Sequence, residues 1–180
     1  MNQLPSPGKA LTLLFTAAFL VACSGSDTKE DEAAAEAARQ AEVAAAEAAR
    51  EAERRAVEEV AAAEQRELEQ AAMAAGTVFY FDFDSSVLKP EAQQALDAHI
   101  ALLRTSDESV RLEGHTDERG TRDYNMALGE RRANAVRDYM VVNGIASYRI
   151  ETISYGEEKP VAYGSGEANW SQNRRVELVK

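Results

Sequence analysis

The sequence has few of the residues that common metal and redox sites require. Its 180 residues include one cysteine and two histidines. A single cysteine cannot form an internal disulfide, and without a Cys-x-x-Cys pair the usual zinc motifs are excluded. No apolar run reaches the roughly 18–20 residues that a membrane-spanning helix needs. Structural zinc sites, internal disulfides and helical membrane spans are therefore not expected.

Positive charge is also scarce. The chain has 20 Lys and Arg against 31 Asp and Glu, for a formal net charge of −11. A general nucleic-acid binder would show a basic stripe that neutralises phosphates, so this class is not favoured. The length suits one domain of about 100–150 residues with additional segments. Composition changes along the chain and divides it into residues 1–22, 23–76 and 77–180.

Residues 1–22 are predicted to be an export signal. Lys9 supplies a positive start, and residues 10–22 form a short apolar core that ends in small residues, as in cleaved secretory signals. The sequence at 20–23, Leu-Val-Ala-Cys, resembles the lipobox of bacterial lipoproteins. In that class the cysteine is acylated and the signal is cut before it, which would make Cys23 the mature N-terminus. The alternative is an ordinary signal peptide in which Cys23 merely lies near the cut.

The lipobox resemblance implies three acyl chains on Cys23. Each methylene buried in lipid contributes about 0.8 kcal/mol, so two or more chains hold a protein firmly on a membrane. Ser24 follows the cysteine, in place of the Asp that tends to retain such proteins in the inner membrane. The resemblance therefore predicts a lipid-anchored protein on the periplasmic face of the outer membrane.

Residues 23–76 are predicted to be a spacer. A short polar tether, residues 24–27, is followed by strong helix formers with no Pro or Gly before Gly76. Large apolar residues are few, so no broad apolar stripe could pack against a core. Two interpretations remain open, a solvated helical spacer and an Ala-based coiled coil that makes the protein an oligomer. The scarcity of Leu and Ile at heptad positions favours the spacer.

Residues 77–180 are predicted to form one α+β domain. The pattern indicates strands at 77–83, 110–115, 149–155 and 175–179, because apolar and β-branched residues alternate there. Helices are expected at 90–104, where Pro90 suits the first turn, and at 124–143, which Gly144 ends. Helices that alternate with strands imply a sheet covered by helices on at least one face.

The helix expected at 124–143 has an arginine on its apolar side. Leu128, Arg132 and Val136 recur at steps of four residues, so they share one helix face. A guanidinium near the core needs carboxylate partners or a ligand to offset its desolvation. Asp117, in the preceding loop, is the nearest candidate partner. A structural ion pair between the two, or an Arg132 side chain that extends to water, are the alternatives to a binding site.

Several motifs in the third region carry a family resemblance. They lie at 114–121 (Gly-His-Thr-Asp-Glu-Arg-Gly-Thr), 124–125, 128–133, 154–160 and 173–177. In this order they resemble the OmpA C-terminal-like domain family, over essentially residues 77–180. Within that family the sequence is most similar to the peptidoglycan-associated lipoproteins. The resemblance implies a βαβαβ(α)β domain whose helices pack on a four-stranded mixed sheet.

The resemblance also implies a function. The family binds peptidoglycan non-covalently at the diaminopimelate of the stem peptide, and its lipoproteins tether the outer membrane to the wall. TolB and other Tol proteins, which act in cell division and envelope integrity, are expected partners. A paralogous wall-binding lipoprotein outside the Tol system is the alternative. The positions that match the family's site are Asp117, Arg132, Asn125, Leu128, Phe83, Asp84 and Arg174.

The chemistry of the implied ligand suits two of these residues. Diaminopimelate presents an ammonium and a carboxylate at the end of one side chain, so a site for it needs an anion beside a cation. Asp117 can accept from the ammonium, and Arg132 can donate two parallel hydrogen bonds to the carboxylate. No catalysis is expected, because no ordered nucleophile and base accompany Asp117 and Glu118. His115 with Asp117 falls short of the three or four ligands of a metal site, and no cofactor is expected beyond the covalent lipid on Cys23.

Overall fold

A computed structural model describes residues 28–180. The predicted signal at 1–22, Cys23 and the polar tether at 24–27 lie outside the described residues. The chain divides into two units, residues 1–51 and 52–180. No helix within the described range is both long and apolar enough to cross a bilayer.

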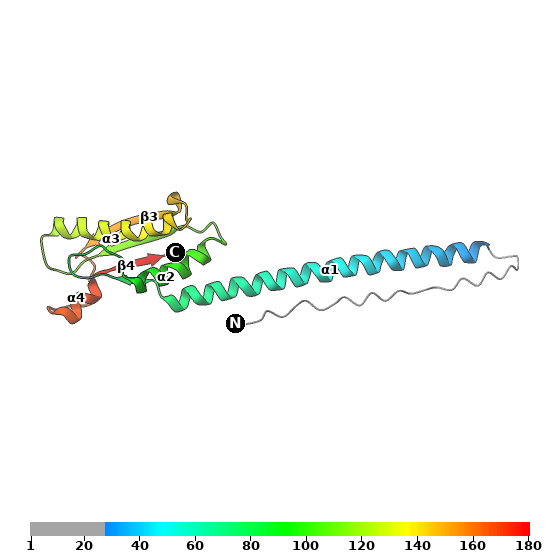
Figure 1. Cartoon of the computed structure of the whole chain (residues 1–180), viewed down its shortest axis with the longest axis horizontal. Coiled ribbons are helices and arrows are strands. Elements are labelled where there is room, and N and C mark those ends of the chain that lie inside the picture. The colour runs from blue at the N-terminus through cyan, green and yellow to red at the C-terminus, as the bar shows by residue number, and fades with distance from the viewer. Residues whose placement is uncertain (1–27) are drawn as a thin grey trace, which may run out of the picture. The chain divides into compact units, whose positions relative to one another are not determined.

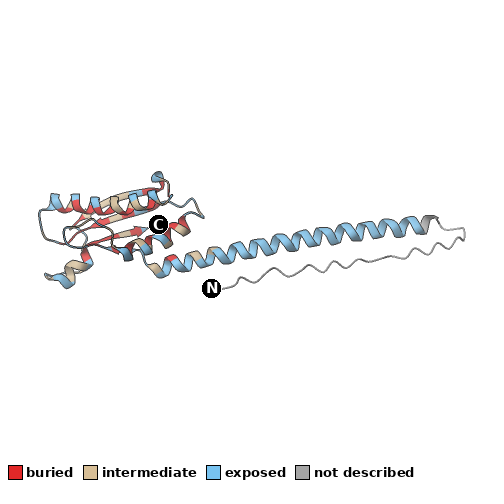
Figure 2. Ribbon diagram, viewed as in Figure 1, coloured by how far each residue is buried: buried red, intermediate tan, exposed pale blue. Residues whose placement is uncertain are grey.

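The Ala- and Glu-rich region forms one helix, α1, at Thr28–Ala75. Its side chains are exposed from residue 31 to residue 64 (Figure 2), as expected for a helix without an apolar stripe. Arg54 and Glu58 form an ion pair one turn apart at 3.6 Å, which is the kind of local contact that supports exposed helices. The exposure suits a solvated spacer, whereas the coiled coil would need a second copy and stays an untested alternative.

The last turns of α1 are packed. Ala72 is 2% exposed, and Gly76, in the left-handed conformation at φ +73°, ends the helix. The Gly76 carbonyl lies 2.7 Å from Nε2 of the buried His99. His99 also meets the Phe79 ring edge-on, at 6.3 Å between ring centroids. These contacts join the helix end to the core of residues 52–180.

The sheet has four strands in the order β1-β4-β2-β3, of which β3 and β4 are labelled in Figure 1. The strands are β1 at Val78–Tyr80, β2 at Val110–His115, β3 at Ile150–Gly156 and β4 at Arg175–Val179. The β2–β3 pair is parallel, and β4 runs antiparallel to both β1 and β2. The predicted four-stranded mixed sheet is thus confirmed.

Two long helices cover one face of this sheet. They are α2 at Pro90–Leu103 and α3 at Arg122–Val142. A short 3₁₀ turn at Ser147–Arg149 lies between α3 and β3. Their apolar faces pack on the strand residues that point the same way, and each fully buried side chain of this size contributes about 1.5–3 kcal/mol. The central core residues come from both helices and three strands: Leu96, Ile100, Val136, Met140, Phe79, Leu112, Val176 and Leu178.

The predicted helix boundaries are close, but the first strand is much shorter than expected. Residues 77–83 were predicted to be extended, yet β1 holds only three residues. Beyond Tyr80 the Phe81 N–H still donates to the Arg174 carbonyl at 2.9 Å. The carbonyls of Phe81 and Asp82, in contrast, accept from the side chains of Arg174 and Arg132. Helix α3 begins two residues earlier than predicted, because the Thr121 hydroxyl caps it by accepting from the Tyr124 N–H.

Candidate functional site

A cavity of about 180 Å³ lies where β2 ends and α3 begins. Six of the seven site residues that the resemblance implied line it, and the seventh, Arg174, hydrogen-bonds one of them, Asp117. The lining residues come from the loop after β1, the loop after β2 and the first three turns of α3: Phe83, Asp84, Thr116, Asp117, Arg119, Gly120, Tyr124, Asn125, Leu128 and Arg132.

Two glycines allow α3 to lie against the sheet at the cavity. A Cβ on Gly114 would sit 2.0 Å from the Gly129 carbonyl oxygen, and a Cβ on Gly129 would sit 2.4 Å from the Ser154 Oγ. Real Cβ atoms do not approach other heavy atoms so closely. Because neither glycine has a Cβ, α3 can pack close to β2, and this close packing brings Leu128 and Arg132 near the end of that strand.

Arg132 is completely buried beneath the cavity. Its Nε, Nη1 and Nη2 donate to the carbonyls of Ser85, His115 and Asp82, at 2.8–3.0 Å. Burial lowers the pKa of the guanidinium to about 10, although the charge of Asp117 opposes the shift. A guanidinium has five N–H donors, so one remains on each terminal nitrogen with no hydrogen bond to a residue in 28–180. Arg132 thus neither extends to water nor forms the ion pair with Asp117 that was weighed as an alternative.

Asp117 is bound by two other arginines. Its Oδ1 accepts from the backbone N–H and Nε of Arg119, both at 3.1 Å, and its Oδ2 accepts from Arg119 Nη2 at 2.6 Å and from Arg174 Nη1 at 3.3 Å. Burial alone would raise the pKa of Asp117, but the hydrogen bonds from Arg119 and Arg174 outweigh it and lower the pKa. All four lone-pair positions of this carboxylate are occupied.

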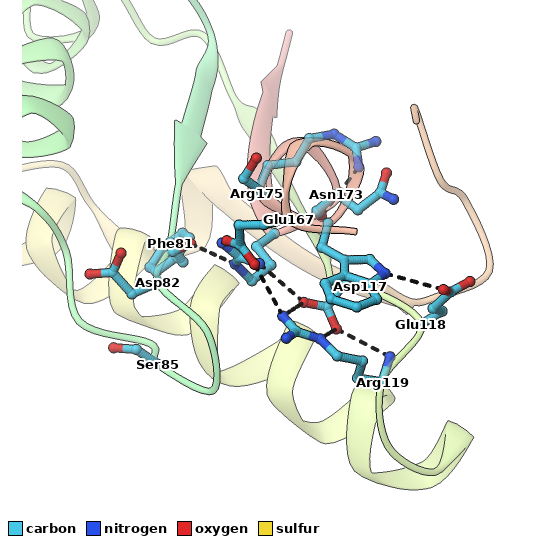
Figure 3. A network of polar contacts seen from close by, with 12 residues as sticks. Phe81, Asp82, Ser85, Asp117, Glu118, Arg119, Glu167, Asn173 and Arg175 are labelled. Atoms are coloured by element: carbon cyan, nitrogen blue, oxygen red, sulfur yellow. Dashed lines mark hydrogen bonds and ion pairs between the residues drawn. The ribbon is translucent and has the colours of Figure 1, made fainter. Parts of the chain in front are cut away.

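Arg119 lies between two aromatic rings. Its guanidinium carbon is 3.9 Å from the Phe83 ring centroid and 4.2 Å from that of Trp170, so both rings favour the cation. Figure 3 shows this guanidinium facing the Asp117 carboxylate, while Glu118 accepts from the indole N–H at 3.1 Å. The sequence prediction missed Arg119, because its ring partners lie 36 residues before it and 51 after it in the chain.

Helix α4, at Glu167–Asn173, positions the residues that contact Asp117 and Arg119 from the other side. Arg174 directly follows it and is 5% exposed. Its Nε donates to the Phe81 carbonyl at 3.1 Å, and its Nη2 pairs with Glu167. Arg174 therefore joins the loop after β1 to Asp117, as a supporting residue behind the cavity.

The rim of the cavity has polar and aromatic residues from separate elements. Asp84, at φ 52°, is the only non-glycine residue with positive φ among those the structure describes. Its carboxylate accepts from the Tyr124 hydroxyl across the opening. Asn125 is 1% exposed and donates to Glu157 at 2.5 Å. Leu128 supplies the apolar wall.

His115 packs beneath the loop that carries Asp117. It is 2% exposed, its ring stacks on Tyr155 at 5.5 Å, and neither ring nitrogen has a hydrogen-bond partner. Burial, together with the positive charge of Arg175, lowers its pKa from 6.5 to about 4, although Glu177 opposes the shift. The folded protein therefore keeps His115 neutral where the unfolded chain would protonate it.

This shift predicts a pH dependence of stability. As pH falls from about 6.5 to about 4, His115 becomes protonated in the unfolded chain but stays neutral in the folded one. The free energy of unfolding therefore decreases over this range. The expected loss is about 3 kcal/mol for one group with a shift of this size. Urea unfolding at several pH values would measure it. His115→Phe should flatten the dependence in this window, and an unchanged slope in that variant would contradict the assignment.

Among the described residues no three His, Cys, Asp or Glu side chains are grouped so that they could hold a metal ion. The small cavity brings together two carboxylates, Asp84 and Asp117, and two guanidinium groups, Arg119 and the buried Arg132. Such an arrangement can bind a compact molecule that carries charges of both signs.

Curated relatives match slightly more than half of this chain. A peptidoglycan-associated lipoprotein of Pseudomonas aeruginosa is 60% identical over 108 residues, which cover 60% of this chain and 64% of the relative. One from Brucella melitensis is 49% identical over 105 residues, 58% of this chain and 62% of the relative. The chain thus matches slightly less than two thirds of the length of these curated relatives.

A solved structure and a family model agree with these relatives. The crystal structure of the peptidoglycan-associated lipoprotein from Burkholderia pseudomallei superimposes with a TM-score of 0.57 at 44% identity, over 58% of this chain and 90% of that one. The model of the OmpA family matches residues 80–174, which include every cavity residue and Arg174. With more than half of its length matched, this chain belongs to the OmpA family.

Proposed function

We propose that this protein is a lipoprotein that binds peptidoglycan non-covalently and tethers the outer membrane to the wall. One observation carries the proposal. Arg132 is fully buried at a small cavity that is also lined by two carboxylates, and two of its N–H groups make no hydrogen bond to the described residues. Keeping a guanidinium buried is costly unless carboxylates or a ligand compensate it. The names of the relatives, which are peptidoglycan-associated lipoproteins, support the same conclusion.

The ligand proposed for the cavity is the diaminopimelate of a stem peptide. Its carboxylate would accept the two remaining N–H donors of Arg132, and charge-assisted hydrogen bonds of this kind contribute about 1.5–3 kcal/mol each. Backbone N–H groups near Gly120, just before α3, would add positive potential. Leu128 would contact the methylenes of the ligand.

The ammonium of the ligand would bind on the acidic side of the cavity. Asp117 is saturated by Arg119 and Arg174, so an ammonium there must replace one Arg119 N–H. Asp84 has unused lone pairs, since the hydroxyl of Tyr124 is its one hydrogen-bond donor among the described residues. We therefore place the ammonium between Asp84 and Asp117, with Asp84 as a direct contact.

The other end of the protein would be the lipid on Cys23, in the outer membrane and facing the periplasm. Helix α1 would act as the spacer, since a helix adds about 1.5 Å of reach per residue. Lipid anchors hold many copies beside the same wall, so modest affinities add by multivalency. TolB and other Tol proteins are proposed partners on the resemblance alone, with a paralogue outside the Tol system as the alternative.

Pull-down with two kinds of wall tests the ligand. Residues 23–180 with Cys23→Ser, which cannot be acylated, are incubated with sacculi that contain diaminopimelate and with walls that carry Lys at that position. Lys lacks the terminal carboxylate, so Arg132 would lose its partner. We expect sedimentation with the first wall and at least about tenfold less with the second. Equal sedimentation with both would contradict the paired-charge account.

We also propose that the protein binds the wall without cleaving it. The cavity lining holds no Ser, Cys, Lys or His side chain, the groups that most often act as nucleophiles and bases in hydrolases. Incubation with soluble muropeptides should therefore leave their masses unchanged, and any new product would favour an enzyme instead.

A further inference from the structure

One buried hydroxyl at the cavity has no hydrogen-bond partner. Four buried side-chain atoms in residues 28–180 lack a partner, and three of them belong to the imidazole rings of His99 and His115, which do not line the cavity. The fourth is Oγ1 of Thr116, a residue that does line the cavity. Buried hydroxyls are nearly always hydrogen-bonded, so this exception points to a missing partner.

Thr116 cannot turn this hydroxyl to solvent. The residue is 3% exposed, and its N–H donates to the Gly156 carbonyl at 2.9 Å, which fixes the backbone. It stands in the chain between His115, whose carbonyl binds Arg132 Nη1 at 2.9 Å, and Asp117. Thr116 is therefore flanked in the chain by one residue that holds the buried cation and another that carries a cavity carboxylate.

We infer that the Thr116 hydroxyl binds the ligand, as a donor to the same carboxylate that Arg132 binds. The inference rests on the proposed function and names the group that the cavity selects. Arg132 offers two N–H donors and Thr116 one O–H donor, while an ionised carboxylate has only acceptor positions. A carboxamide would place its NH₂ against these donors. The site is thus specific for a free carboxylate over its amide.

Removing this hydroxyl should change stability and binding in opposite directions. Valine has nearly the shape of threonine, so Thr116→Val removes an unsatisfied polar group from the ligand-free protein without opening a cavity. The midpoint of urea unfolding should stay the same or rise. Binding should weaken about tenfold, because a hydrogen bond to a charged group is lost. A purely structural threonine would lose stability and binding together.

Calorimetric titration of the Cys23→Ser chain with a muropeptide that carries a diaminopimelate tripeptide provides the test, together with urea unfolding. Thr116→Ser keeps the hydroxyl and should bind within about threefold of the parent. Thr152→Val is the matched control, since the Thr152 hydroxyl is bonded to Asn134 away from the cavity. That control should bind like the parent. The muropeptide amidated at the diaminopimelate carboxylate should bind at least about tenfold more weakly to the parent.

The outcomes separate this inference from the proposed function. If the parent does not bind the tripeptide, the proposed function fails. If the parent binds and Thr116→Val binds equally well, or loses stability in parallel with binding, only the role of Thr116 is overturned. If Thr116→Val does not fold, Thr116→Ala replaces it and the serine variant must then bind more tightly than alanine. Equal binding of amide and acid would refute the selectivity.

Discussion

Arg132→Lys is expected to abolish sedimentation with purified sacculi. Lysine keeps the positive charge but is a single point donor, whereas Arg132 serves three carbonyls and retains two N–H groups for a ligand. A lysine that bonds to the carbonyls has too few donors left for a bidentate contact. We expect at least about 100-fold weaker binding, from the loss of two charge-assisted hydrogen bonds.

The same change should lower stability, because lysine cannot donate to all three of the carbonyls that Arg132 binds. An unsatisfied buried polar group costs about 1–3 kcal/mol, which urea unfolding would detect. Arg137→Lys on the same helix is the matched control, since Arg137 only pairs with Asp138 at the surface. That control should bind and unfold like the parent. A folded Arg132→Lys protein that sediments normally would mean that Arg132 is structural and the ligand lies elsewhere.

Gly114→Ala is expected to have the largest effect on stability. The new Cβ would lie 2.0 Å from the Gly129 carbonyl oxygen, a backbone atom of α3 that cannot turn away. The helix must shift from the sheet or the strand must bend. Overpacking typically costs about 1–3 kcal/mol and occasionally more, and a clash between backbone atoms should lie at the upper end of that range. That is a large part of the 5–15 kcal/mol that typically stabilises a domain. Urea unfolding measures the loss, and a change below about 1 kcal/mol would show that the contact is slack.

Gly129→Ala offers a second test of the same contact. Alanine is favoured over glycine inside a helix by about 1 kcal/mol, so an unconstrained site would become more stable. Here the Cβ would meet the Ser154 Oγ at 2.4 Å, and we expect destabilisation. Ser154→Ala removes that atom and should recover part of the loss in the double variant. Additive effects would argue against a shared contact.

Periodicity predicted the long elements well and the site loops poorly. Helix α2 has its apolar residues on one face, and Leu96 and Ile100 are buried as that pattern requires. In the stretch at 77–83 alternation also indicated a strand. However, the carbonyls of Asp82 and Phe81 accept hydrogen bonds from Arg132 and Arg174. These two arginines lie about 50 and 90 residues further along the chain. No local pattern in residues 77–83 carries that information.

The candidate site shows the same division. The resemblance identified six cavity residues and Arg174 from the order of short motifs, and the structure brings them together. In the structure, Asp117 does not pair with Arg132. Its carboxylate instead forms an ion pair with Arg119, whose guanidinium lies between Phe83 and Trp170. Nothing in the sequence distinguishes Thr116 from other threonines, because its hydroxyl is unusual only in being buried without a partner in the folded domain.

The sequence by itself determined that this chain has a long exposed helix without an apolar stripe, followed by an α+β domain of the OmpA family, with Arg132 on an apolar helix face. These features depend on neighbours within a few residues, or on ordered motifs. Only the tertiary structure decided which groups stay unpaired once the chain is packed. Arg132 has two N–H donors left because carbonyls from other segments accept the remaining three, and the Thr116 hydroxyl is buried with no partner among the described residues. The lipid predicted on Cys23 remains a matter of local sequence, since it depends on the residues beside it.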